Sequence, residues 1–265
     1  MLRKLRILAL LLILATVGLG AWRANARLTA WEHTIHVAIY PIAADDSPAA
    51  AAYVRTLDNE SFDEISRWLQ AQTDHFGRSV LQPISLNVAA PLADRPPPAP
   101  PHPGVLDAML WSLKLRWWAT QHDRIDGPKP QVRLFVLFHD PDRSSALPHS
   151  TGLAKGQIGV IHAFASRLQR RQNNVVIAHE LLHTFGATDK YDPATLQPIF
   201  PDGYAEPDRN PRLPQPKAEI MAGRTPIDDR TAEIPGSLDD TLIGPATAKE
   251  IGLIAGTSGR PRSTP

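Results

Sequence analysis

The sequence contains no cysteine. This absence excludes disulfide bonds, a cysteine nucleophile and thiolate metal sites, so histidine, aspartate and glutamate are the only strong side-chain metal ligands available. The chain also lacks a large net charge, because 28 Lys and Arg residues balance 27 Asp and Glu residues. With no basic tract interleaved with aromatic residues, the chain gives no sign of nucleic-acid binding. Its 43% hydrophobic and 21% charged residues are typical of a globular protein.

The longest hydrophobic run lies near the N-terminus. Three basic residues precede an apolar stretch over residues 7–22, which is shorter than the roughly 20 residues that a spanning helix prefers. The following Ala24-Asn25-Ala26 matches the small-x-small pattern of a signal-peptide cleavage site. We therefore expect residues 1–26 to be an export signal or, alternatively, an uncleaved membrane anchor. Both interpretations predict a protein that is exported or tethered outside the cytoplasm.

Hydrophobic periodicity predicts strands and helices in the next part of the chain. Strands are expected at residues 33–42, 84–89, 132–139 and 157–165. Helices are expected from Ser61 to Phe76, with Ser61 and Glu64 as a capping box, and from Val105 to Thr120. In the second helix, the leucines and tryptophans are expected to be core residues: Leu106, Leu110, Trp111, Leu113, Trp117 and Trp118.

Proline is frequent, at 26 of 265 residues. Residues 90–104 form a proline-rich connection that cannot become a helix, and we interpret it as a surface excursion rather than a domain boundary. Periodicity fades after Asp192, and a last helix is expected from Pro245 to about Ile254. The predicted fold class is α+β. A small mixed sheet with packed helices occupies residues 27–186, an irregular subdomain occupies residues 187–265, and both belong to one domain.

A further helix is predicted from Val175 to Phe185, capped by Asn174, and its two faces differ. At about 100° per residue, six apolar residues fill one continuous arc: Val175, Ile177, Ala178, Leu181, Leu182 and Phe185. The other face carries His179, Glu180, His183 and Thr184. A purely structural helix has little reason to place two histidines and a glutamate beside such an apolar arc.

His179 and His183 are four residues apart, so their imidazoles project from successive turns on one side of the helix. Two ring nitrogens can then reach one zinc ion at about 2.0–2.1 Å. Glu180 follows the first histidine, where its carboxylate can accept a proton from a zinc-activated water as general base. In the HExxH pattern, the two histidines therefore bind the metal and the glutamate transfers the proton.

A third ligand is expected just beyond the helix. Gly186 can adopt a left-handed conformation that ends the helix, and Asp189 can return to the metal three residues later. If Asp189 is only a turn residue, Glu206 or Glu219 is the replacement. Asp192 is expected to contact one of the metal ligands, without touching the metal itself, and so to fix the orientation of that ligand. Four other histidines are expected to be structural: His36, His75, His139 and His162.

The resulting HExxHxxGxxD string, residues 179–189, resembles the metzincin zinc peptidases, whose longer motif ends in His. The Asp variant is similar to their snapalysin-like branch. The resemblance implies a methionine turn beneath the metal, for which Met221 is the candidate. It also implies an edge strand that binds extended substrate, for which we choose residues 157–165 together with the looser segment 152–156 before them. Where some metzincins have a tyrosine after the methionine, this chain has Gly223.

The sequence thus predicts an exported zinc-dependent peptidase with Zn²⁺ as its cofactor and a peptide or protein as its substrate. Tyr191 or Tyr204 could take the place of the missing tyrosine, whereas Arg224 is expected to be solvated rather than to bind a substrate carboxylate. Two alternatives stay open: a gluzincin-like zincin with a distant glutamate ligand, and a non-catalytic zinc-binding envelope protein. Residues 7–22 are a candidate membrane tether. Cleavage specificity and oligomeric state do not follow from the sequence.

Overall fold

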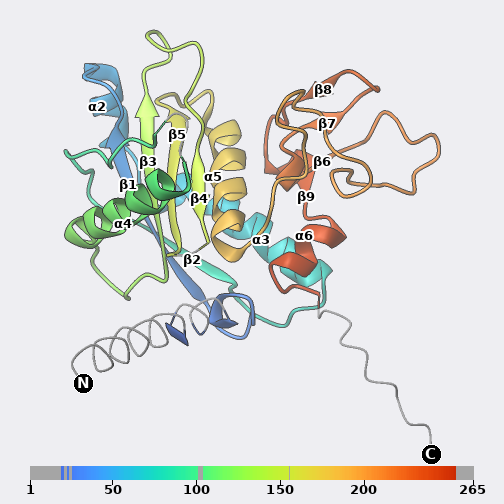
Figure 1. The fold of residues 1–265 in the computed structure, drawn as a ribbon, viewed down its shortest axis with the longest axis horizontal. Coiled ribbons are helices and arrows are strands. Elements are labelled where there is room, and N and C mark those ends of the chain that lie inside the picture. Colours follow the sequence, from blue (N-terminus) through green and yellow to red (C-terminus); the bar gives the residue numbers. More distant parts are fainter. Residues whose placement is uncertain (1–18, 21–22, 24–25, 101–103, 155, 255–265) are drawn as a thin grey trace, which may run out of the picture.

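A computed structural model describes residues 19–20, 23, 26–100, 104–154 and 156–254 (Figure 1). They form a sheet flanked by helices and, after Gly186, an irregular part made of short elements (Figure 1). Most of the predicted signal or anchor lies outside the described residues. Within them, no helix combines the length and the apolar character needed to span a membrane.

The sheet is mixed and has five strands in the order β2-β1-β3-β5-β4. The first four strands run parallel, and β4 pairs antiparallel with β5 at the sheet edge. The bounds are β1 Ile35–Ala43, β2 Ile84–Val88, β3 Val132–His139, β4 Thr151–Leu153 and β5 Ile158–Phe164. The four predicted strands are therefore confirmed, and the mixed sheet with several helices agrees with the predicted α+β class.

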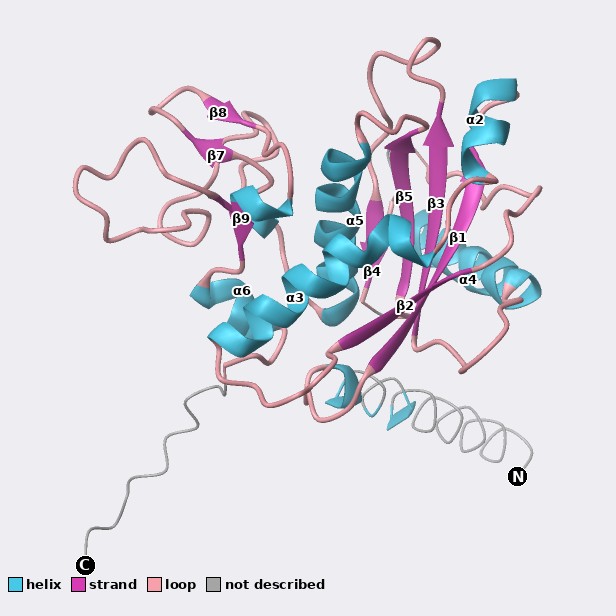
Figure 2. Cartoon of the chain, turned by 180° about the vertical axis from the view of Figure 1, so that it is seen from behind, coloured by secondary structure: helices cyan, strands magenta, loops and turns pink. Residues whose placement is uncertain are grey.

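Helices cover both faces of the sheet (Figures 1 and 2). On β1, Val37 and Ile39 face the core shared with α3 (Asp63–His75) and α5 (Arg170–Phe185). Tyr40 faces the opposite core, which α4 (Val105–His122) closes. The strand alternation therefore separates two apolar layers. Two short elements complete this part: α2 Pro48–Val54 and η1 Asn59–Phe62.

Two predicted helix starts are wrong. The capping box near α3 joins Asp58 and Ser61 at the start of η1, not Ser61 and Glu64. Helix α5 begins at Arg170, so Asn174 is buried inside it and donates to the Glu64 carboxylate at 3.0 Å instead of capping. The extra first turn is polar and carries no apolar period, which is why the hydrophobic pattern missed it.

The predicted core face of α4 is also wrong. The buried residues are Leu115 and Ala119, whereas Trp111 and Trp118 are half-buried against the sheet. The remaining predicted core residues are 59–73% exposed: Leu106, Leu110, Leu113 and Trp117. Because α4 is apolar nearly all round, residue spacing alone could not select the face that meets the sheet.

After Gly186 the chain forms only short elements: β6 Ala218–Glu219, η2 Ile220–Ala222, β7 Thr225–Pro226, β8 Ala232–Glu233, η3 Leu238–Asp240, β9 Thr241–Leu242 and α6 Pro245–Glu250. Helix α6 begins at the predicted Pro245 but ends four residues before the predicted Ile254. The part packs against α5 and α3 through apolar residues such as Ile220 and Leu238.

Candidate metal centre

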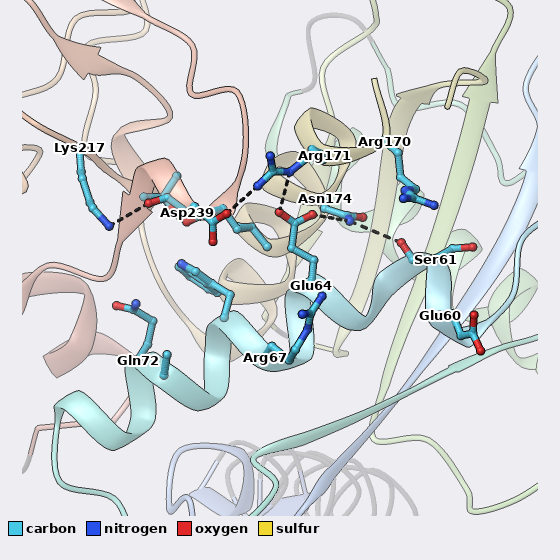
Figure 3. Close-up of a pocket in the computed structure, with 14 residues that line it drawn as sticks. Glu60, Ser61, Glu64, Arg67, Gln72, Arg170, Arg171, Asn174, Lys217 and Asp239 are labelled. Carbon is cyan, nitrogen blue, oxygen red and sulfur yellow. Dashed lines mark hydrogen bonds and ion pairs between the residues drawn. The ribbon is translucent and has the colours of Figure 1, made fainter. Parts of the chain in front are cut away.

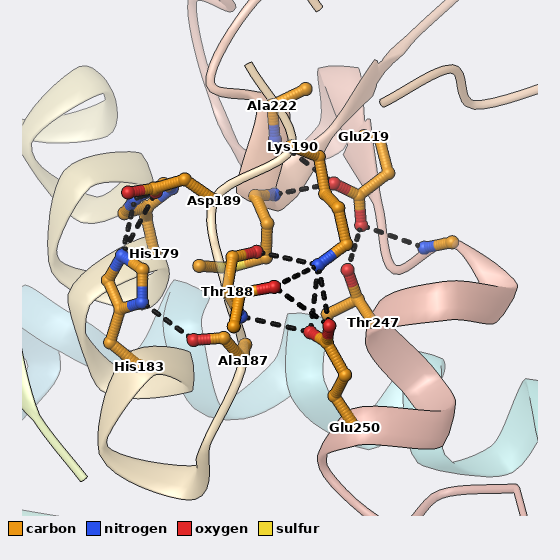
Figure 4. A network of polar contacts seen from close by, with 12 residues as sticks. His179, His183, Ala187, Thr188, Asp189, Lys190, Glu219, Ala222, Thr247 and Glu250 are labelled. Carbon is orange, nitrogen blue, oxygen red and sulfur yellow. Dashed lines mark hydrogen bonds and ion pairs between the residues drawn. The ribbon is translucent and has the colours of Figure 1, made fainter. Parts of the chain in front are cut away.

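Helix α5 holds the two motif histidines between the two parts of the molecule. Its predicted apolar arc is confirmed, since all six residues are buried: Val175, Ile177, Ala178, Leu181, Leu182 and Phe185. Gly186 ends the helix with φ 107°, the left-handed conformation that glycine adopts without strain. The chain then turns back, so that Asp189 faces His179 and His183 (Figure 4).

Three donor atoms converge at this turn. The Nε2 atoms of His179 and His183 are 3.1 Å apart, and Asp189 Oδ1 lies 3.2 Å and 3.1 Å from them, respectively. Ligand atoms about 2.0–2.1 Å from a tetrahedral zinc ion are about 3.3 Å from one another. The chemistry and spacing of the donor set therefore fit a zinc ion held by His179, His183 and Asp189.

Backbone carbonyls orient both imidazoles. His179 Nδ1 lies 2.9 Å from the Ile220 carbonyl oxygen, and His183 Nδ1 lies 2.8 Å from that of Ala187. If each Nδ1–H donates to its carbonyl, each Nε2 presents a lone pair toward Asp189. Three electron-pair donors facing one another favour a cation at their centre.

The same contacts shift the protonation equilibria of the metal-free site. Burial lowers the pKa of His179, but the bond to Asp189 and the nearby Glu180 charge outweigh burial and raise it. Burial raises the pKa of Asp189, but the two imidazoles outweigh it and hold that pKa well below its usual range. Without a metal, the cluster would therefore hold a proton in its place.

Glu180 lies beside the cluster but is not bonded to it in the same way. One ligand atom from each of His179, Glu180 and His183 falls within 4.8 Å of the others, a looser grouping than the Asp189 contacts. Glu180 is 6% exposed, and its Oε2 has no hydrogen-bond partner among the described residues. Burial raises the pKa of Glu180, although the two histidines oppose this shift. The arrangement suits a proton acceptor better than a third ligand.

The edge strand β4 passes directly over the motif. A Cβ atom on Gly152 would lie 2.5 Å from His183 Cβ and 2.6 Å from the Glu180 carbonyl oxygen. Strand β4 can therefore approach α5 this closely only because residue 152 is glycine. The edge-strand candidate was right only in its first part: residues 152–153 belong to the edge strand β4, whereas residues 157–165 contain the inner strand β5. A three-residue strand is too short for hydrophobic periodicity to reveal.

The two candidate glutamate ligands lie elsewhere. The buried Glu219 carboxylate accepts from the amides of Met221, Ala222 and Gly244 and from the Thr247 hydroxyl, at 2.7–3.1 Å. Its oxygens are thus occupied in shaping the turn that contains Met221, which is fully buried. Glu206 is instead paired with Arg209 at 3.3 Å on the surface.

A cavity of about 370 Å³ opens beside the cluster. Its wall includes His179, Glu180 and Tyr191, together with mostly apolar neighbours. Arg224 also lines it and is half-buried rather than solvated as expected, with its guanidinium 3.3 Å from the Ala232 carbonyl oxygen. Burial, helped by the charges of Asp189 and Glu180, raises the pKa of Tyr191.

Other predicted residues have structural contacts. Tyr204 is buried and packs on Phe200 away from this cavity. Asp192, expected to orient a ligand, instead accepts from the Ala194 amide at 2.8 Å within a turn. His162 lines the cavity, and its Nδ1 lies 2.8 Å from His139 Nε2. The groups that do orient the ligands are backbone carbonyls, which residue types cannot reveal.

A second cavity, of about 590 Å³, lies between α3, α5 and the irregular part (Figure 3). Its charged side chains largely satisfy one another. Arg171 pairs with Glu64 at 3.4 Å and with Asp239 at 2.6 Å, and Lys217 donates to the Asp239 carbonyl oxygen at 2.8 Å. These contacts stabilise the junction of the two parts, and they show no cluster of catalytic groups.

Comparison of the sequence with protein-family models and with curated proteins finds no match. The α+β fold with its five-stranded mixed sheet is thus established by the structure alone. Any more specific function must be inferred from the chemistry of the residues around His179 and His183.

Proposed function

We propose that this chain is a zinc-dependent peptidase of the metzincin type that acts outside the cytoplasm. One observation carries the proposal: three ligand-type atoms of His179, His183 and Asp189 lie 3.1–3.2 Å apart, with the buried Glu180 beside them. The pairing of a three-ligand cluster with an adjacent proton acceptor is the arrangement that hydrolytic zinc sites use.

The surroundings of the cluster support the same class. An antiparallel edge strand, β4, lies against the helix that carries the motif. A glycine turn returns the chain to the histidines, and a buried methionine turn follows at Met221. The Asp189 ligand favours the snapalysin-like branch, and the occupied carboxylate of Glu219 disfavours the gluzincin-like alternative.

The residues divide the chemistry among them. A bound zinc ion would lower the pKa of a coordinated water and polarise the substrate carbonyl. Glu180, whose carboxylate lies within 4.8 Å of a ring nitrogen of each histidine, would take the proton from the attacking water and give it to the leaving amine. Tyr191 lines the adjoining cavity, and its hydroxyl is our candidate donor to the developing oxyanion.

Substrate would bind as an added strand. The outer side of β4 is the edge of the sheet, so its backbone groups can pair with an extended peptide. A peptide on this edge would pass over Glu180 and His183, because Gly152 lies directly above them. The cavity beside His179 would then receive a side chain of the substrate.

The test is zinc stoichiometry. We expect about one zinc ion per chain in the purified protein and in Glu180→Gln, and a strong loss in Asp189→Ala. Asp192→Ala is the matched control, because Asp192 only stabilises a turn and should leave zinc binding intact. Absence of zinc from the unmutated protein after refolding with metal would refute the proposal. If Asp189→Ala retains zinc, a residue other than Asp189 is the third ligand.

Activity is the second readout. Glu180→Gln should lower the rate of peptide hydrolysis by about 10²–10⁴-fold while zinc stays bound, because the amide cannot accept the proton. The assay would use unstructured protein and a mixture of peptides as substrates. If zinc is bound but Glu180→Gln matches the unmutated protein, the site is structural and the chain is not a peptidase.

A further inference from the structure

Helix α4 exposes a largely apolar face. Fourteen large hydrophobic residues of the described chain are exposed, and six of them lie on this one helix. At about 100° per residue these six lie within a single arc about 140° wide, which also contains the half-buried Arg116 and the exposed Thr120. The six are 57–80% exposed: Val105, Leu106, Met109, Leu110, Leu113 and Trp117. Patches of this kind on a protein surface commonly mark an interaction site.

The face is separate from the candidate metal centre. Helix α4 packs on the sheet through Leu115 and Ala119, and the Trp118 ring lies 4.9 Å from that of Phe135. Helix α5 covers the opposite face of the sheet. The exposed arc of α4 therefore points away from the sheet, and an occupant there would leave the β4 edge and the cavity beside His179 free.

The chain itself indicates what covers this face. The apolar stretch over residues 7–22 precedes the described body and is a candidate membrane tether. Arg27, just after that stretch, lines a cavity together with Gln131, which follows the connection leaving α4. The two segments thus meet at one end of the sheet. A tether at residue 27 would hold this end of the body, and the connection from α4, close to the bilayer.

The charges near the face suit the same occupant. Lys114 borders the apolar arc, and Arg124 and Lys129 follow the end of α4; all three are exposed and outnumber the two exposed acidic residues of this segment, Asp107 and Asp126. Arg23 and Arg27, next to the apolar stretch, are exposed as well. Basic residues close to a membrane are attracted to anionic lipids, and an exposed apolar helix face beside such residues can bury its side chains in the interface.

We propose that the exposed face of α4 is a membrane-docking surface that inserts its leucines and Trp117 into the interface of an anionic lipid bilayer. Docking would set the orientation of the body, with the α5 side of the sheet turned away from the lipid. This interaction is independent of the proposed peptidase activity, because none of its residues contacts the metal centre.

The experiment uses the full chain with a specific protease site inserted between Ala26 and Arg27. The protein is bound to mixed phosphatidylcholine and phosphatidylglycerol vesicles, cleaved, and sedimented with them. We expect the body to stay bound after cleavage, and Leu110→Ser/Trp117→Ser to raise its free-to-bound ratio at least about tenfold. Leu81→Ser/Leu168→Ser is the matched control, since these leucines are 98% and 97% exposed elsewhere and should change little.

Three results would overturn the proposal. The cleaved body could leave the vesicles equally in all three proteins, or the α4 variant could stay bound as firmly as the control. The unmutated body could also be a dimer in solution while the α4 variant is a monomer. In that case a second copy of the chain, and not the bilayer, would cover the face. Thermal unfolding of each variant checks that the fold is intact, and vesicles of phosphatidylcholine alone should bind more weakly if the basic residues contribute.

Discussion

The parts before and after Gly186 are held together by different forces. In the first part, apolar side chains are fully buried in layers on both faces of a sheet, as Leu134 is on one face and Phe135 on the other. In the second part, carboxylates add specific polar contacts to the apolar packing: the buried Glu219 accepts from four donors, and the exposed Glu250 bonds to Lys190 and Thr188. Regular structure follows where backbone groups pair with each other, and irregular structure where side chains satisfy them.

The candidate metal centre needs both parts. The histidines come from the first, whereas Asp189 and the Ile220 carbonyl come from the second. Changes that damage either part should therefore affect the site, but through different interactions. The following substitutions test this contrast, from the largest expected effect to the smallest.

The largest effect on stability should come from the apolar layers. We expect Leu134→Ala to lower the free energy of unfolding by about 2–5 kcal/mol, because it leaves a cavity in a fully buried position. Leu110→Ala, on the exposed face of α4, should change it by less than about 0.5 kcal/mol. Urea unfolding measures both. A large loss of unfolding free energy for Leu110→Ala would mean that the face of α4 that contains Leu110 is buried, as the sequence predicted.

The second part should depend on one polar group. Glu219→Gln replaces two acceptor oxygens with one, so two of the four donors lose their partner. We expect a loss of about 2–3 kcal/mol and weaker zinc binding. Glu206→Gln, at a surface ion pair, should cost less than about 1 kcal/mol and leave zinc binding unchanged. Equal effects of the two substitutions would mean that the second part does not depend on the Glu219 carboxylate.

Tyr191 belongs to the second part and lines the cavity beside His179 and Glu180, which belong to the first. Removing only its hydroxyl in Tyr191→Phe should lower kcat by about ten- to a hundredfold with little change in KM, if that hydroxyl stabilises the oxyanion. Tyr204→Phe is the matched control, because Tyr204 is buried outside the cavity. A parallel loss in both variants would point to stability instead of catalysis.

The smallest effect should be a pH dependence. Burial raises the pKa of Glu250, but Lys190 and Thr188 outweigh burial and lower it. A lowered folded-state pKa means that this stabilisation is present above the unfolded pKa of about 4.3 and is lost as pH falls through the folded value. We expect Glu250→Gln to reduce stability near neutral pH and to flatten its decline in acid. Unfolding series between about pH 7 and pH 3 would show whether the curves of the two proteins converge.

The sequence was most informative where apolar period and motif agreed. It predicted four of the five strands of the main sheet, the apolar arc of α5 and the turn at Gly186 that brings Asp189 to the histidines. It failed on the exposed face of α4, because a helix with apolar residues on all sides offers no preferred face. It did not separate β4 from β5, although its edge-strand candidate included residues 152–156, and it missed the carbonyls of Ile220 and Ala187. Residue types alone reveal neither a three-residue strand nor a backbone acceptor.

The bond between the Ile220 carbonyl and His179 affects when, during synthesis of the chain, the site can form. All residues of the HExxHxxGxxD string lie within eleven positions, yet the group that orients His179 is synthesised about thirty residues after Asp189. A chain that emerges N-terminus first would carry the whole motif before it could hold its ligands in register. Truncations ending before residue 218 would keep the signature and lose the site, so metal uptake would report that the last part of the chain has docked.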